Sequence, residues 1–140
     1  MNFKNFNSKF LFIFISLFLF DQITKHFIKN VMFTKNIGFF KTTNTGASFS
    51  ILEGYTFFLI VISIIFIIGL MYYLINYKID YPILYSFILI LSGAIGNLFD
   101  RFLFGHVFDF IKIYWWPIFN FADIYLSIGV ILLFYFEFKK

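Results

Sequence analysis

The chain has 140 residues, of which 61% are hydrophobic, 26% aromatic and only 13% charged, and it carries a net charge of +4. A soluble domain carries charge on roughly a quarter of its residues, so this composition excludes a surface that faces water on all sides. The positive charge fits anionic lipid headgroups better than nucleic acid. The absence of cysteine excludes disulfides, thiolate metal sites and cysteine nucleophiles.

The first hydrophobic segment, residues 10–20, is uncharged but too short to cross a bilayer, because a helix needs ~20 residues to do so. Lys4 and Lys9 precede it, and a cleaved signal peptide is one interpretation, but no small-residue cleavage site follows. A full crossing predicts a helix over 9–29, which takes Asp21 to the membrane edge or inside it.

Residues 30–54 are not a crossing. They are rich in Asn, Gly, Thr and Ser, with aromatic residues between them. This pattern is typical of turns and short strands lying at the membrane interface. We therefore predict a small extramembrane, β-rich cap between the first and second helices.

Two plain membrane spans follow the cap. Residues 55–77 and 81–99 contain no charged residue, and they predict helices over 55–77 and 81–101 that form an antiparallel hairpin. Residues 103–116 are expected to form a second loop on the side of the cap. The aromatic end of this loop, residues 114–116, suits an aromatic belt at headgroup depth.

The last segment predicts a helix over 117–138, with Pro117 in its first turn, where proline is tolerated. Four crossings place both termini on one side of the membrane. Counting Lys and Arg does not settle the orientation, and we favour cytoplasmic termini because the lysines on that side lie directly against the spans. The prediction is an all-α integral membrane protein with four transmembrane helices, one domain over 1–140 and an extracytoplasmic cap.

The unusual polar residues collect at one predicted membrane face, beneath the cap. Ionisable groups at the edge of the hydrocarbon cost on the order of a few kcal/mol if they are left unpaired, so their collection suggests a site. The members are Asp21, Asn44, Glu53, Asn97, Asp100, Arg101, Asp109, Asn120 and Asp123.

Helical spacing places Gly93, Gly96, Asn97, Asp100 and Arg101 on one face of the third helix, at i, i+3, i+4, i+7 and i+8. The two glycines allow the backbone of another helix to approach closely. A purely structural alternative is an ordinary helix contact with a clamp between Asp100 and Arg101.

Asp21 and Lys25 are at i, i+4, so an intrahelical ion pair is a structural explanation that stays open for them. Asp109 and Asp123 have no cation at helical pairing distance, and the stretch around Asp109 is expected to be a loop. Asn120 and Asp123 are three residues apart, so both can face the interior of the bundle.

Two carboxylates held close together at the hydrocarbon boundary cannot both ionise easily, and such a pair shares one proton. The ionised group can activate a water, while the other polarises a peptide carbonyl and later protonates the leaving amine. This chemistry requires no metal and no cofactor, and we predict neither. The two histidines, His26 and His106, do not form a zinc motif, and neither a Gly-x-Ser-x-Gly elbow nor a Gly-rich phosphate loop occurs.

Five segments, in chain order, resemble the lipoprotein signal peptidase family, which is also called signal peptidase II or aspartyl peptidase family A8. They are DQITK at 21–25, NTGASFS at 44–50, GAIGNLFDR at 93–101, VFDF at 107–110 and FNFAD at 119–123. Five ordered motifs are specific, and the resemblance covers nearly the whole chain. Ser92 and Ser48 depart from the pattern, where glycine and alanine are common, but both are small.

The resemblance implies a peptidase of the bacterial cytoplasmic membrane that cuts diacylglyceryl-modified prolipoproteins just before the lipidated cysteine, at an extracytoplasmic site. It implies that Asp109 and Asp123 are the catalytic pair and that globomycin-type cyclic peptides inhibit it. We expect membrane lipids as neighbours, no nucleic-acid partner and a monomer. The residues implied to support the site or hold substrate are Asp21, Lys25, Asn44, Gly46, Asn97, Asp100, Arg101, Asn120 and Ala122.

Two other functions compete with this one. A small membrane transporter or an assembly subunit would use the polar cluster as an ion path or partner contact. An ion path should place ionisable groups through the depth of the bilayer, and the middles of the second and third predicted helices contain none. A lipid-handling enzyme such as an acyltransferase would need a nucleophile or a histidine base in the cluster, and neither is evident.

Overall fold

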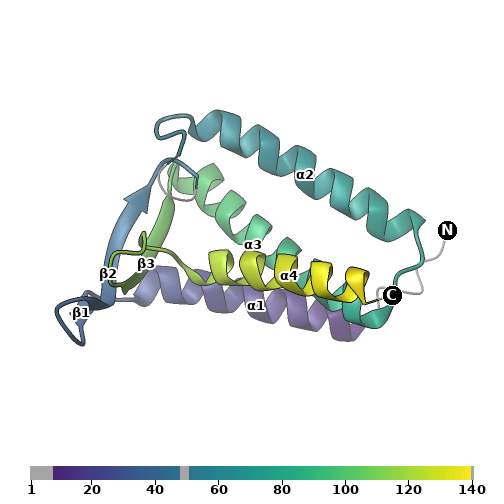
Figure 1. Cartoon of the computed structure of the whole chain (residues 1–140). Coiled ribbons are helices and arrows are strands. Elements are labelled where there is room, and N and C mark those ends of the chain that lie inside the picture. The colour runs from purple at the N-terminus through teal and green to yellow at the C-terminus, as the bar shows by residue number, and fades with distance from the viewer. Residues whose placement is uncertain (1–7, 48–50, 140) are drawn as a thin grey trace.

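The computed structural model describes residues 8–47 and 51–139, so Ser48, the end of the 44–50 motif, Lys4 and Lys140 lie outside the described residues. Four helices and a small sheet make up the fold (Figure 1). The helices are α1 (Ser8–Phe27), α2 (Thr56–Asn76), α3 (Tyr81–Phe104) and α4 (Phe121–Phe138). The strands are β1 (Val31–Met32), β2 (Ile37–Asn44) and β3 (Val107–Ile113).

All four helices are long and apolar enough to cross a membrane, which confirms the predicted multi-pass architecture. The sheet lies at one end of the bundle, and the start of α1 and the end of α4 lie at the opposite end (Figure 1). Four helix ends therefore lie near the sheet: the end of α1, the start of α2, the end of α3 and the start of α4.

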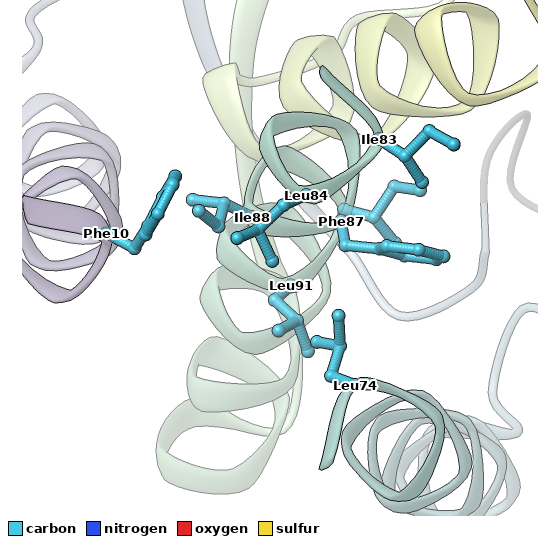
Figure 2. Close-up of a cluster of buried hydrophobic side chains, with 8 residues drawn as sticks. Phe10, Leu74, Ile83, Leu84, Phe87, Ile88 and Leu91 are labelled. Atoms are coloured by element: carbon cyan, nitrogen blue, oxygen red, sulfur yellow. The ribbon is translucent and has the colours of Figure 1, made fainter. Parts of the chain in front are cut away.

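The third helix, α3, is the centre of the bundle, because the other three helices all pack against it. Most of its residues are buried, whereas α2 buries only Leu59 and Leu74. Figure 2 shows Phe10 of α1 and Leu74 of α2 pointing toward the apolar side chains of α3. Since Phe10 belongs to this core, the structure favours a packed first crossing over a cleaved signal peptide.

Close approach of α3 and α4 depends on glycine. A Cβ added at Gly93 would collide with the backbone carbonyl of Ala122, and one added at Gly129 would lie 2.8 Å from the carbonyl oxygen of Ser86. These contacts confirm that the small residues of α3 allow the backbone of another helix to approach. The start of α4, which presents Asp123, is thereby held against α3.

The sheet is antiparallel, in the order β1-β2-β3. Thr42 pairs with Asp109 and Asn44 pairs with Val107, with a register shift between Phe39 and Thr42. The cap is therefore not built from the segment between the first two helices alone, and the prediction of a loop around Asp109 is wrong. The edge strand β3 forms because it pairs with β2, a partner far away in the sequence.

The start of the last helix also differs from the prediction. Phe119 pairs with Ile111 of β3, so Pro117 lies in extended chain and α4 begins only at Phe121. Asn120 then caps the helix. At the other end of the loop, α3 continues to Phe104 before it ends. The first two helices lie within two residues of their predicted bounds, 9–29 and 55–77.

Candidate active site

Asp109 is presented by β3 and is only 3% exposed. Its Oδ2 accepts a hydrogen bond from Nδ2 of Asn44 at 2.9 Å, and its Oδ1 accepts one from Nδ2 of Asn120 at 2.6 Å. Asn44 is the last residue of β2, so strand pairing brings its amide to Asp109. The carboxyl group of Asp109 is thus held between the sheet and the start of α4.

Asp123 lies at the third position of α4 and forms a capping box with Asn120. Its Oδ2 accepts the backbone N–H of Asn120 at 3.1 Å, and its own N–H donates to Oδ1 of Asn120 at 3.0 Å. Its Oδ1 accepts Nδ2 of Asn97 at 2.8 Å. The carboxylate is therefore fixed at a helix N-terminus, which favours negative charge.

Asn120 connects the two aspartates. Its side-chain Nδ2 donates to Asp109, while its backbone N–H donates to Asp123. Each of the four carboxylate oxygens accepts one N–H in this way. A carboxylate has about four acceptor positions, so both aspartates keep capacity for a water or a substrate group.

Both aspartates line one cavity of about 550 Å³. Asn44, Asn97 and Arg101 contribute the other large polar groups of its lining. The rest of the wall is largely apolar and comes mainly from α2, α4 and the chain before α4, with Ala94 of α3 and Val107 of β3. Representative members of this apolar wall are Leu59, Ile62, Phe66, Pro117, Ile124 and Ile128.

The surroundings of Asp109 change its pKa. Burial, and next the charge of Asp123, raise the pKa of Asp109 to about 6. Hydrogen bonds from Asn44 and Asn120 and the charge of Lys25 oppose this rise. The surroundings of Asp109 therefore favour its neutral form.

Behind the aspartates, a buried ion cluster joins α1 to α3 and α4. Lys25 is only 1% exposed, and its Nζ lies 2.7 Å from Asp21 and 2.9 Å from Asp100. The ion pair between Asp21 and Lys25 is thus confirmed, but it is more than a local contact. Oδ1 of Asp21 also accepts the backbone N–H of Ala122 at 2.9 Å, which attaches α1 to the start of α4.

The proposed clamp between Asp100 and Arg101 is wrong. Asp100 turns to Lys25, whereas Nη2 of Arg101 donates to the carbonyl oxygen of Gly46 at 2.6 Å. Adjacent residues of a helix point about 100° apart, so they reach different neighbours. Arg101 thereby holds the turn that follows β2 at the rim of the cavity.

Lys25 also determines which way the amide of Asn97 faces. An ammonium group has donors only, so the atom 3.0 Å from Nζ must be Oδ1 of Asn97. That oxygen also accepts Nδ2 of Asn120 at 3.1 Å. The Nδ2 of Asn97 is consequently directed to Asp123, so the ion cluster and the aspartates form one hydrogen-bonded network.

Small residues make room for this network. A Cβ added at Gly96 would lie 2.8 Å from Oδ2 of Asp21 and 3.4 Å from Cβ of Ala122. The structure brings together eleven of the residues that the sequence analysis singled out. They are Asp21, Lys25, Asn44, Gly46, Asn97, Asp100, Arg101, Asp109, Asn120, Ala122 and Asp123.

Glu53 does not join them: it is exposed and makes no ion pair or hydrogen bond with the described residues. Two supporting residues were missed. Nε2 of Gln22 donates to the carbonyl oxygen of Gly96, and the single hydroxyl hydrogen of Thr56 is shared between the carbonyl oxygens of Thr45 and Gly105, each 3.1 Å from Oγ1. Gln22 lies inside the 21–25 motif, which was the available signal, whereas nothing local marks Thr56.

Comparison with known proteins identifies the family. The family model for signal peptidase (SPase) II matches residues 13–139. The chain is 41% identical to the lipoprotein signal peptidase of Caldicellulosiruptor bescii, over 86% of this chain and 85% of that protein. It is also 41% identical to that of Staphylococcus aureus, over 82% and 78% of the two chains.

A solved structure described as a bacterial membrane enzyme, determined by the in meso method at 2.3 Å resolution, superimposes with a TM-score of 0.89 at 33% identity. The match covers 96% of this chain and 90% of that one. Sequence and fold agree over nearly the whole length. The chain belongs to the signal peptidase II family.

Proposed function

We propose that this protein is an aspartyl endopeptidase that removes signal peptides from diacylglyceryl-modified prolipoproteins, with Asp109 and Asp123 as its catalytic pair. Family membership supports the reaction and its substrate class. One observation supports the pair: Asn120 holds both carboxylates, and both line the same cavity.

The raised pKa of Asp109 makes this residue the proton donor in the reaction that we propose. Asp123 acts as the base. Asp123 takes a proton from a water as the water oxygen bonds to the peptide carbonyl carbon, and Asp109 gives its proton to the carbonyl oxygen. As the C–N bond breaks, the proton on Asp123 passes to the leaving amine, and a hydroxyl of the diol returns a proton to Asp109.

The surroundings of the pair suit a substrate that lies in the membrane. The apolar walls of the cavity match the hydrophobic residues of a signal peptide and the acyl chains on the cysteine. Membrane lipids surround the many exposed apolar side chains of the helices, such as Phe57 and Phe102. The hydrogen bonds and ion pairs of the network join α1, α3, α4 and the sheet, which supports a single domain. A monomer is part of the same proposal.

The topology we propose has cytoplasmic termini and an extracytoplasmic sheet, in the bacterial cytoplasmic membrane. The catalytic pair would then lie beneath the cap at the outer face. A lipidated cysteine anchored in the outer leaflet reaches that depth. The four crossings support this arrangement, because they bring the start of α1 and the end of α4 to the end of the bundle opposite the sheet (Figure 1).

The test is cleavage of a lipidated precursor by the purified protein in detergent micelles, with the products identified by mass spectrometry. We expect one cut, directly before the lipidated cysteine, that a globomycin-type cyclic peptide inhibits. Asp109→Asn and Asp123→Asn should each abolish cleavage, whereas the matched exposed variant Glu53→Gln should leave it unchanged. Near-normal turnover by either aspartate variant would overturn the assignment of the pair.

A transporter is not favoured. Ion flux across the membrane of proteoliposomes that contain the protein, without cleavage of a lipidated precursor, would favour a transporter instead.

A further inference from the structure

Four serines lie in the membrane helices α2, α3 and α4, and two of them, Ser63 and Ser127, line the cavity that contains Asp109 and Asp123. The hydroxyl groups of Ser86 and Ser92, in α3, each donate to the carbonyl oxygen four residues earlier. This is the usual arrangement of a serine in a membrane helix, where no water is available. The hydroxyls of Ser63 in α2 and Ser127 in α4 make no hydrogen bond with any described residue.

Both unpartnered hydroxyls belong to the lining of the cavity that contains Asp109 and Asp123. Ser127 follows Asp123 by one helical turn, so it lies on the same face of α4 and about 6 Å deeper in the bundle. Ser63 comes from the other wall, on the face of α2 that also presents Leu59 and Phe66. The two helices therefore present one hydroxyl each to the space below the catalytic pair.

The two serines are the polar side chains of an otherwise apolar part of the cavity wall. The neighbouring wall residues, such as Ile62, Ile124 and Ile128, have no hydrogen-bonding side chains. Ser63 is half-buried and Ser127 exposed, so both hydroxyls are accessible from the cavity. Once an occupant covers them, each needs a hydrogen-bond partner, so the two serines favour a ligand that donates or accepts hydrogen bonds there. Acyl chains have no such groups, whereas a peptide backbone has both.

A substrate segment near the cut site presents free backbone groups. A peptide bond must leave the helical conformation before the catalytic pair can attack it, and the freed N–H and C=O groups then need partners inside the membrane. An extended chain advances about 3.3 Å per residue, so a depth of about 6 Å corresponds to about two residues. The signal peptide continues from the cut into the membrane, toward Ser127.

Building on the proposed function, we propose that Ser63 and Ser127 form a subsite that binds the unwound backbone of the signal peptide about two residues before the scissile bond. The hydroxyls position the peptide between α2 and α4, and they take no part in proton transfer. The subsite recognises main-chain groups, so it is compatible with different apolar side chains in the substrate.

The test compares Ser63→Ala, Ser127→Ala and the double variant with the wild type on a lipidated precursor. Loss of one neutral hydrogen bond should lower kcat/KM by about five- to tenfold, mainly through KM, and the double variant should lose more. Ser127→Thr, which keeps a hydroxyl, should restore most of the activity. The matched control is Ser86→Ala, which removes a hydroxyl that bonds within its own helix.

A second substrate locates the contact. In it, an ester replaces the amide bond about two residues before the cut, which removes one backbone N–H and weakens the carbonyl as an acceptor. The wild type should lose activity on this substrate, whereas the double alanine variant should show little further loss.

The outcomes separate the two proposals. Wild-type kinetics in both alanine variants, while Asp109→Asn is inactive, would overturn the subsite and leave the proposed function intact. Failure of the wild type to cleave any lipidated precursor would overturn the proposed function, and the subsite with it. Equal losses in Ser86→Ala and the cavity variants would also overturn the subsite, because the effect would then belong to helix packing.

Discussion

The side-chain amide of Asn120 donates a 2.6 Å hydrogen bond to Oδ1 of Asp109, although the same residue is the N-cap of α4. One side chain thus has two separable tasks, because its Oδ1 caps the helix and its Nδ2 holds the carboxyl group of Asp109. Serine is also a good N-cap, but it is too short to reach Asp109 in the same way.

This double role predicts that Asn120→Ala lowers both the stability and the activity of the protein. Loss of the cap should cost about 1 kcal/mol of unfolding free energy, and kcat should fall by roughly 10- to 100-fold. Asn120→Ser should recover the thermal midpoint in detergent but not kcat. If Asn120→Ser restored both quantities, the contact with Asp109 would be irrelevant to catalysis.

The second prediction concerns pH. The pKa of Asp109 is raised to about 6, so its carboxyl group is neutral below that pH and charged above it. If Asp109 supplies the proton, kcat/KM of the free enzyme should fall as pH rises through about 6. A rising limb at this pH would instead make Asp109 the base and Asp123 the acid.

Substitution of Asn44 should shift the pH at which kcat/KM falls. Its hydrogen bond stabilises the charged form of Asp109 and so opposes the rise of the pKa. Asn44→Ala should therefore displace the falling limb of the pH–rate profile to higher pH, whatever it does to the maximal rate. Glu53→Gln, an exposed change in the same cap, should leave the limb where it is.

The raised pKa of Asp109 also makes the stability of the protein depend on pH. The carboxyl group has a pKa of 3.8 in its unperturbed state and about 6 in the folded protein, so the folded state binds more protons between these values. Stability should therefore fall as pH rises from about 4 to about 6, by an amount on the order of 3 kcal/mol for this group. Thermal unfolding in detergent across this window should show the decline, and Asp109→Asn should reduce it.

The features that the sequence analysis predicted correctly depend on local pattern. Uncharged runs of about 20 residues identify α2 and α3, and the i, i+3, i+4 spacing of Gly93, Gly96 and Asn97 identifies the inner face of α3. The features that it missed depend on partners far away in the sequence. No local pattern could show that Phe119 pairs with Ile111 and delays the start of α4.

The same distinction applies within the site. The Asp21–Lys25 ion pair was foreseen because its members are one turn apart. The partner of Asp100 was not, because Lys25 lies on another helix and reaches it only after α1 packs against α3. Spacing along a helix therefore predicted which residues share a face, and only the packing of helices decided which of them pair.

A further prediction concerns the buried ion cluster. Lys25→Met would leave the carboxylates of Asp21 and Asp100 without their cation, and breaking a buried pair in this way costs about 3–5 kcal/mol. We expect little folded protein in detergent extracts. Adding Asp100→Asn to Lys25→Met removes one of the stranded charges and should recover part of the folded yield. Additive losses in the double variant would show that the two residues are not coupled.

The last prediction compares two glycines in different helices. A Cβ at Gly93 would collide with the carbonyl oxygen of Ala122 and with Leu126, so Gly93→Ala should push the start of α4 away from α3 and displace Asp123. We expect a lower thermal midpoint and a loss of peptidase activity of at least about 100-fold, because a displacement near 1 Å is enough for that.

At Gly69 in α2, a Cβ would meet nothing within 4 Å. Gly69→Ala should therefore leave activity unchanged and raise stability by up to about 1 kcal/mol through helix propensity. Equal effects of the two variants on activity would show that close packing of α3 against α4 does not position the carboxylate of Asp123.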